Sequence, residues 1–101
     1  MESIKINITG KIYHTGYRYF IKQAASQLDI KGCIFYCPDR SVRILAIGEA
    51  NNMDKFINYC RIGNIDSSVE KVSMSQIPPA EFDSFEVVEE ETSVKHINHD
   101  Y

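Results

Sequence analysis

The feature that most constrains the fold is a switch between two hydrophobic periods near the start of the chain, because strands and helices bury their apolar residues at different spacings. Residues 4–9 alternate apolar and polar side chains, which predicts a strand with one buried face. From Tyr17 to Leu28 the apolar residues recur at intervals of three and four, which predicts an amphipathic helix. A short loop around Gly16 must therefore carry the chain from a strand into a helix.

A hairpin follows this first helix. Residues 33–37 and 42–47 have the spacing of two further strands, and Tyr36 shares one face of the earlier strand with Ile34. The residues between the two strands are typical of a β-turn: Pro38, Asp39, Arg40 and Ser41. We therefore expect these two strands to pair antiparallel.

A second helix and two strands complete the pattern. We expect the helix to begin at a cap provided by Asn51 or Asn52 and to end at Gly63. Residues 69–77 predict a strand, with Val72 and Met74 on one face, which the following prolines terminate. A last short strand is expected at about residues 85–88.

The order of elements, β-α-β-β-α-β with an additional C-terminal strand, predicts the split βαβ topology of a ferredoxin-like α/β sandwich. We expect a mainly antiparallel sheet with the strand order 4-1-3-2 and with both helices on one face. In this topology the first two strands are parallel, so the loop at residues 11–17 should lie close to Tyr36. We assign residues 1–88 to the domain and residues 89–101 to a polar, mobile tail.

Length and charge narrow the classes of function. A chain of 101 residues holds one domain, and its 11 basic and 14 acidic residues give a net charge of −3, which disfavours nucleic-acid binding. The first residues contain no continuous apolar run, so neither a signal peptide nor a membrane anchor is predicted. Three cysteines without a paired CxxC framework are typical of a reducing compartment. We expect a cytoplasmic monomer that binds neither nucleic acid nor membrane.

The loop before the first helix is the candidate binding site. A loop that enters a helix N-terminus presents free backbone N–H groups and the positive end of the helix dipole to one point, which favours an anion. Gly16 permits close approach, and Arg18 adds a guanidinium group suited to phosphate or carboxylate. A solvated arginine beside a turn glycine is the alternative interpretation, since such short patterns recur widely. We expect a small anion such as inorganic phosphate or sulfate to bind here.

Residues 8–18 read ITGKIYHTGYR, which resembles the acylphosphatase loop, commonly V-x-G-x-V-Q-G-V-G-F-R. The resemblance continues at the hairpin, residues 37–42, and at residues 82–87, and it covers residues 4–88. It implies a ferredoxin-like fold and hydrolysis of small acyl phosphates to carboxylate and phosphate. It also implies that neither a metal nor an organic cofactor is needed.

The resemblance further implies roles for individual residues. The phosphoryl oxygens would be bound by a loop set comprising Tyr13, His14, Thr15, Gly16, Tyr17 and Arg18. Among these, Arg18 would be the catalytic cation, in the electrostatic role that phosphoryl transfer chiefly requires. The second catalytic residue of the family is an asparagine late in the second strand, which orients the attacking water. Tyr36 stands at that position.

Two positions depart from the family pattern. A tyrosine hydroxyl at Tyr36 would lie several ångströms farther from the backbone than an asparagine amide, and a misplacement of about 1 Å can cost roughly 100-fold in rate. His14 replaces a glycine that would adopt a left-handed conformation, and it could add a proton donor or remain an exposed side chain. Asn64 could compensate, because the second helix returns toward this edge, whereas Asn51 and Asn52 lie at the opposite edge. We expect weak or absent hydrolysis.

Other candidate sites are less supported. The sequence leaves open a non-catalytic module, a pseudoenzyme that binds an anion or a protein on the same scaffold, and less favourably a nucleic-acid-binding domain. Arg40 and Arg43 could extend the positive patch, although such charges usually lie on a solvated face. His96, His99 and Asp100 offer too few ligands of fixed geometry to predict a metal site.

Overall fold

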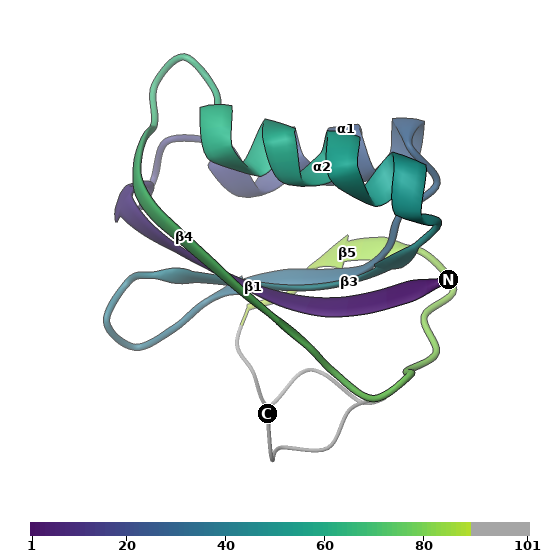
Figure 1. Cartoon of the computed structure of the whole chain (residues 1–101). Coiled ribbons are helices and arrows are strands. Elements are labelled where there is room, and N and C mark those ends of the chain that lie inside the picture. Colours follow the sequence, from purple (N-terminus) through teal and green to yellow (C-terminus); the bar gives the residue numbers. More distant parts are fainter. Residues whose placement is uncertain (90–101) are drawn as a thin grey trace.

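Seven elements follow one another in the predicted order (Figure 1). The computed structural model describes residues 1–89, so the predicted tail lies, beyond Glu89, outside the described residues. The elements are β1 (Glu2–Lys11), α1 (Tyr17–Gln27), β2 (Lys31–Tyr36), β3 (Val42–Gly48), α2 (Ala50–Ile62), β4 (Ser68–Gln76) and β5 (Phe85–Val87).

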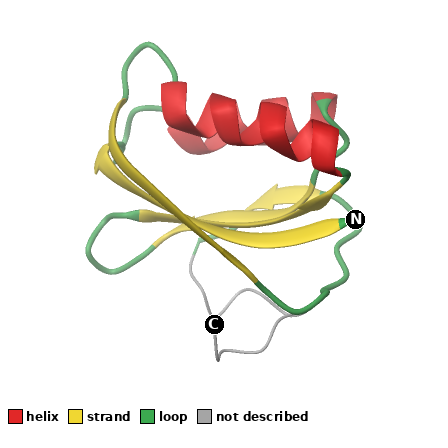
Figure 2. Ribbon diagram, in the orientation of Figure 1, coloured by secondary structure: helices red, strands yellow, loops and turns green. Residues whose placement is uncertain are grey.

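The strands form one five-stranded sheet in the order β4-β1-β3-β2-β5. β3 pairs antiparallel with both β1 and β2, so β1 and β2 run in the same direction. β5 adds a parallel strand to the outer edge of β2. Both helices cover one face of the sheet (Figure 2). The predicted ferredoxin-like α/β sandwich is therefore confirmed, and the expected 4-1-3-2 order is extended by β5.

The main core lies between the helices and the sheet. α1 contributes Tyr17 and Ile21, α2 contributes Phe56 and Cys60, and Ile6 of β1 faces them from the sheet. All five side chains are fully buried. Because this packing fixes both helices relative to β1, it also fixes the place where the chain passes from β1 into α1.

A smaller apolar cluster lies on the other side of the sheet. It is built by Cys33 and Phe35 of β2, by Leu45 of β3 and by Ile77. The three cysteines of the chain are free thiols, and burial raises the pKa of Cys33 and of Cys60 to about 12. These two thiols are therefore packing residues rather than nucleophiles.

The predicted start of the second helix is wrong by about two residues. α2 begins at Ala50, with Glu49 rather than Asn51 or Asn52 in the capping position, and no side chain caps its N-terminus. β3 remains paired up to Gly48, where an added Cβ would meet Ile30 at 2.4 Å. The chain enters α2 two residues after Gly48, so the asparagines fall inside the first turn of the helix.

A bulge in β4 lies opposite the end of β1. The register between β1 and β4 shifts between Thr9 and Gly10, which leaves Glu70 of β4 as an extra residue. The shift brings Val69, together with Val72, into contact with the main core, whereas Met74 is largely exposed. Gly10 has φ 140°, and an added Cβ would lie 2.2 Å from the Ser68 carbonyl oxygen, so this position requires glycine.

Candidate functional site

The loop from Ile12 to Gly16 joins β1 to α1, and we call it the β1–α1 loop. The amide and the hydroxyl of Thr15 both donate to the Ile12 carbonyl oxygen, at 3.2 and 2.5 Å. His14 (φ 60°) and Gly16 (φ 83°) are left-handed. His14 therefore keeps the conformation expected of the family's glycine, at a cost of about 1 kcal/mol.

The start of α1 carries unused backbone donors. Gly16 is the N-terminal capping residue, and its carbonyl oxygen accepts the first helical bond, from the Phe20 amide at 3.1 Å. Within residues 1–89 the amides of Gly16, Tyr17 and Arg18 have no protein acceptor. The first turn of α1 contains no acidic residue. Three N–H groups and the positive end of the helix dipole thus remain available to an anion.

Tyr36, at the end of β2, lies against this loop. Its hydroxyl oxygen accepts a hydrogen bond from the His14 amide at 3.2 Å, and its O–H points to the Ile12 carbonyl oxygen at 3.5 Å. The predicted proximity of the loop and Tyr36 is confirmed. The ring of Tyr36 leans toward the loop, and its hydroxyl occupies the His14 amide, one of the backbone donors of the loop.

The Arg18 guanidinium lies over the ring of Tyr36, with its central carbon 4.2 Å from the ring centroid. A cation in this position is attracted by the negative face of the ring. No carboxylate in the described part of the chain pairs with Arg18. The guanidinium is therefore held by an aromatic face, and no carboxylate of residues 1–89 neutralises its charge.

Aromatic rings continue from Tyr36 to the hairpin turn. The ring of Tyr13 is 4.8 Å from that of Tyr36 and is stacked on that of His14 at 4.0 Å, and the Arg40 guanidinium lies 4.4 Å from its centroid. Arg40 has φ 69° in the turn. Of the two arginines near the hairpin, Arg40 thus approaches the loop, whereas Arg43 donates to Asn7 Oδ1 at 3.1 Å on the sheet.

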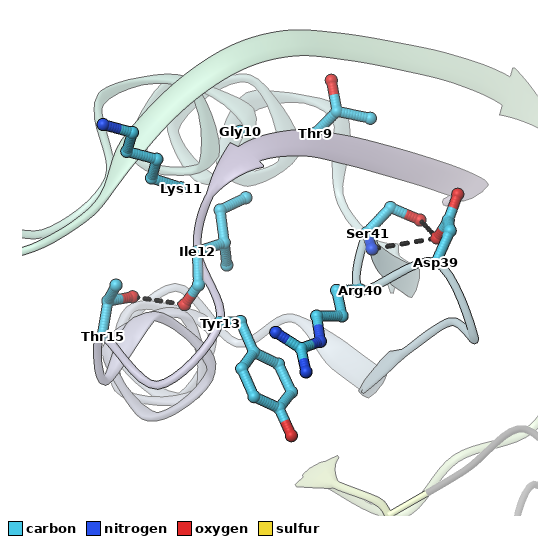
Figure 3. Close-up of a pocket in the computed structure, with 9 residues that line it drawn as sticks. All are labelled: Thr9, Gly10, Lys11, Ile12, Tyr13, Thr15, Asp39, Arg40 and Ser41. Carbon is cyan, nitrogen blue, oxygen red and sulfur yellow. Dashed lines mark hydrogen bonds between the residues drawn. The ribbon is translucent and has the colours of Figure 1, made fainter.

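A hollow of about 330 Å³ opens between the end of β1, the β1–α1 loop and the hairpin turn (Figure 3). The guanidinium of Arg40 lies beside the ring of Tyr13 at its border. Asp39 accepts hydrogen bonds from the Ser41 hydroxyl and amide at 2.6 and 2.9 Å, which lower the pKa of its carboxyl. Asp39 therefore stabilises the turn.

Two hydrogen bonds join the C-terminal end of α2 to the β1–α1 loop and the start of α1. The buried hydroxyl of Tyr17 donates to the Cys60 carbonyl oxygen at 2.8 Å, and the Asn64 side-chain amide donates to the Thr15 carbonyl oxygen at 2.8 Å. Sequence reasoning expected Asn64 near this edge but did not assign it to the loop backbone. The return of α2 toward the loop was the only signal available, since the partners are 49 residues apart.

Among residues 1–89, no group of three or more His, Cys, Asp or Glu side chains could hold a metal ion. The weak metal candidate formed by His96, His99 and Asp100 lies outside these residues. No helix in the same part of the chain is long and apolar enough to cross a membrane.

Comparison with known proteins places this geometry in a family. The family model Acylphosphatase matches residues 4–87. An acylphosphatase of Clostridium acetobutylicum is 37% identical over 87% of this chain and 98% of its own length, and one of Archaeoglobus fulgidus is 33% identical over 86% and 98%. The crystal structure of acylphosphatase from Bacillus subtilis superimposes with a TM-score of 0.83 at 27% identity, covering 87% of this chain and 99% of that one.

Proposed function

This chain belongs to the acylphosphatase family, and from that premise we propose that it binds small acyl phosphates at the β1–α1 loop and hydrolyses them slowly to carboxylate and phosphate. The observation that carries the proposal is the first turn of α1, where Arg18 has no carboxylate partner in residues 1–89 and three amides have no protein acceptor in the same residues. An anion with several oxygens, such as a phosphoryl group, can accept from all of these donors.

In the proposed reaction a water oxygen bonds to phosphorus while the bond from phosphorus to the acyl oxygen breaks. The carboxylate leaves, and the proton of the water passes to solvent or phosphate. Arg18 and the amides of Gly16, Tyr17 and Arg18 stabilise the charge on the phosphoryl oxygens throughout. Such catalysis depends on position and electrostatics and uses no covalent intermediate with this chain.

We propose slow turnover because several parts of the loop are already engaged. The His14 amide is bound to Tyr36, and the Thr15 amide is bound to Ile12, so neither is free for a phosphoryl oxygen. At the position of the family's asparagine, Tyr36 offers a hydroxyl that is directed at the loop backbone. The water would then lack the side-chain amide that orients it in the family.

A second candidate function is anion binding without turnover. It is favoured by the same contact, because a hydroxyl that occupies a loop donor and a ring that covers one face of Arg18 restrict catalysis more than binding. The bound species would be inorganic phosphate or sulfate, or an intact acyl phosphate. Such a protein would be a pseudoenzyme that has kept the site of its family.

Steady-state hydrolysis of an aryl acyl phosphate by the wild type, Arg18→Ala and Tyr36→Asn tests the proposal, with the folding of each protein checked by circular dichroism. We expect slow wild-type turnover, loss of this turnover in Arg18→Ala and faster turnover in Tyr36→Asn. A wild type that is inactive while Tyr36→Asn is active would favour the non-catalytic alternative. Activity that survives in Arg18→Ala would contradict the assignment of the site.

A further inference from the structure

Asn64 is the first residue after Gly63, which ends α2, and its side chain reaches the β1–α1 loop. Its backbone is fixed by a tight turn: the Asn64 amide donates to Ser67 Oγ at 3.0 Å, and the Ser67 amide donates to the Asn64 carbonyl oxygen at 3.1 Å. From this turn Nδ2 donates to the Thr15 carbonyl oxygen at 2.8 Å. A rigid backbone thus delivers one donor to one loop carbonyl.

The Thr15 carbonyl has no place in the hydrogen-bond ladder of α1, because the first acceptor of the helix is the Gly16 carbonyl. Asn64 supplies the partner that the helix does not. No peptide bond among the described residues is cis, and in a trans peptide the C=O and the following N–H point in opposite directions. Holding the Thr15 oxygen toward Asn64 therefore directs the Gly16 N–H away from it, where no protein acceptor is present in residues 1–89.

Gly16 is the residue of this peptide that most needs such a constraint. At φ 83° it occupies a region that glycine enters and leaves with little steric resistance, so the peptide before it can reorient. A Cβ built on Gly16 would lie 3.6 Å from Asn64 Nδ2, an ordinary contact distance, so the Asn64 side chain lies next to this residue. Asn64 thus restrains the point of greatest freedom in the loop.

The other end of the Asn64 amide argues against a purely stabilising role. Oδ1 is shielded from solvent and has no hydrogen-bond partner in the described part of the chain. The amide cannot be reversed to satisfy it, because Oδ1 would then face the Thr15 carbonyl oxygen, another acceptor. A buried acceptor without a donor destabilises a folded protein, so this residue keeps the bond to Thr15 at the expense of an unpaired oxygen.

We propose that Asn64 is a positioning residue of the anion site: through the Thr15 carbonyl it holds the Gly16 N–H toward the phosphoryl group. The inference rests on the proposed function. Because its Oδ1 is shielded, Asn64 neither contacts the anion nor orients the attacking water, so it does not replace the family's catalytic asparagine. It acts on binding, before any chemical step.

The test uses the full chain, labelled with ¹⁵N, as wild type and as Asn64→Ala and Asn64→Asp. Asn64→Ala removes the donor. Asn64→Asp keeps the size and shape of the side chain, exchanges the donor for an acceptor and adds a negative charge that also repels an anion, so the size of the positioning effect is taken from Asn64→Ala. The control is Asn58→Ala, on the exposed surface of α2. Three quantities are measured: the Gly16 amide resonance, the dissociation constant of inorganic phosphate, and KM and kcat for an aryl acyl phosphate.

We expect both Asn64 variants to shift the Gly16 amide resonance and to weaken phosphate binding about tenfold, the effect of one lost hydrogen bond to a charged group. KM should rise by a similar factor while kcat changes little, and Asn58→Ala should match the wild type. A residue that served stability alone would lower the unfolding midpoint and leave the Gly16 resonance and the phosphate titration of the folded protein unchanged.

The outcomes separate this inference from the proposed function. Equal phosphate binding and an unchanged Gly16 resonance in the wild type and both Asn64 variants would overturn the positioning role alone. A wild type that binds phosphate but turns nothing over would remove the hydrolase proposal, and weaker binding by the Asn64 variants would still support positioning. A wild type that binds no phosphate would overturn both.

Discussion

The two halves of the anion site meet the rest of the protein in different ways. In the hairpin-side half, residues 13–15, the amides of His14 and Thr15 are bound by protein oxygens, and the rings of Tyr13 and His14 are exposed. In the helix-side half, residues 16–18, the amides have no acceptor among residues 1–89, and the side chain of Tyr17 is fully buried. In the hairpin-side half, protein oxygens accept from the backbone amides of His14 and Thr15. The helix-side half is anchored in the core by Tyr17, and its backbone amides are available to a ligand.

This difference indicates where the capacity to bind an anion lies. A backbone donor serves a ligand only if no protein acceptor already uses it, and it serves best if its peptide is held rigidly. The helix-side half meets both conditions, because Tyr17 bonds to the end of α2 and Asn64 holds the carbonyl of the Thr15–Gly16 peptide, which carries the Gly16 N–H. In the hairpin-side half the amides of His14 and Thr15 fail the first condition, because protein oxygens already accept from them. This half contains Tyr13, His14 and Thr15, which stand where the family's loop reads Q-G-V.

The largest expected effect compares the two arginines of the site. Arg18→Ala should weaken phosphate binding about 100-fold, because it removes charged hydrogen bonds from the helix-side half. Arg40→Ala should weaken it by less than about threefold, because Arg40 is exposed and stacks on Tyr13. Isothermal titration calorimetry with phosphate measures both. Comparable losses would mean that the anion lies between the halves, near the hairpin turn.

Removing one tyrosine hydroxyl from each half tests how much each half contributes to the stability of the fold. Tyr17→Phe should lower the free energy of unfolding by about 1 kcal/mol, because it leaves the buried Cys60 carbonyl without its donor. Tyr13→Phe, on an exposed ring, should change it by less than about 0.5 kcal/mol. Denaturant titration of both variants gives these values. A large loss in Tyr13→Phe would show that the hairpin-side half is anchored as firmly as the other.

The variants Tyr17→Phe and Tyr13→Phe should also differ in how their stability depends on pH. Burial, with a smaller contribution from Cys60, raises the pKa of Tyr17 far above the usual tyrosine value of about 10. The folded state therefore retains this proton where the unfolded state loses it, so stability is present below about pH 10 and falls as the pH rises further. The decline above pH 10 should be shallower in Tyr17→Phe than in the wild type, and Tyr13→Phe should follow the wild type more closely.

The two left-handed residues of the loop give opposite expectations. Gly16→Ala should lower the free energy of unfolding by about 1 kcal/mol through backbone strain alone, since a Cβ there meets Asn64 Nδ2 only at an ordinary contact distance of 3.6 Å. His14→Gly should raise it by about 0.5 kcal/mol, because relief of strain exceeds the entropy that glycine adds to the unfolded chain. Thermal or denaturant unfolding checks the signs. A destabilised His14→Gly would indicate that stacking on Tyr13 outweighs the strain.

The fold could be predicted from the sequence because its signals are local. Periods of two and of about 3.6 residues marked the strands and helices, and glycine correctly marked the end of α2. The start of α2 was misplaced because it depends on how far β3 stays paired with β1, which is up to Gly48. The bulge at Glu70, which brings Val69 to the core beside Val72, was not predicted. Neither the start of α2 nor the bulge can be recognised from the spacing of hydrophobic residues.

The candidate site was predicted in its location and less well in its hydrogen bonds. Parallel β1 and β2 bring Tyr36 to the loop, which topology alone anticipates. The partner of the Tyr36 hydroxyl depends on the lean of one ring, and the bond from Asn64 to Thr15 depends on where α2 ends relative to the loop. These are distances of a few ångströms between residues far apart in sequence, and residue type does not determine them.

The smallest expected effect comes from a substitution that frees a backbone amide in the hairpin-side half, as the amides of the helix-side half already are. Tyr36→Phe removes the hydroxyl that occupies the His14 amide and keeps the aromatic ring beneath Arg18. The released N–H becomes available to an anion, so phosphate binding should tighten about threefold, less than the full value of a new hydrogen bond because the loop must still accommodate the ligand. Titration of phosphate followed by ¹⁵N resonances of His14 and Gly16 measures the change in each half separately.

Tyr19→Phe is the matched control for Tyr36→Phe. Tyr19 is exposed, and its ring centroid lies 6.0 Å from the central carbon of the Arg18 guanidinium, farther than that of Tyr36. It should leave phosphate binding unchanged. Weaker binding by Tyr36→Phe would contradict the division of the site, because it would mean that the Tyr36 hydroxyl turns from the loop and donates to the bound anion. Tyr36 would then bind substrate directly, and the hairpin-side half would contribute to binding through a side chain in place of its backbone amides.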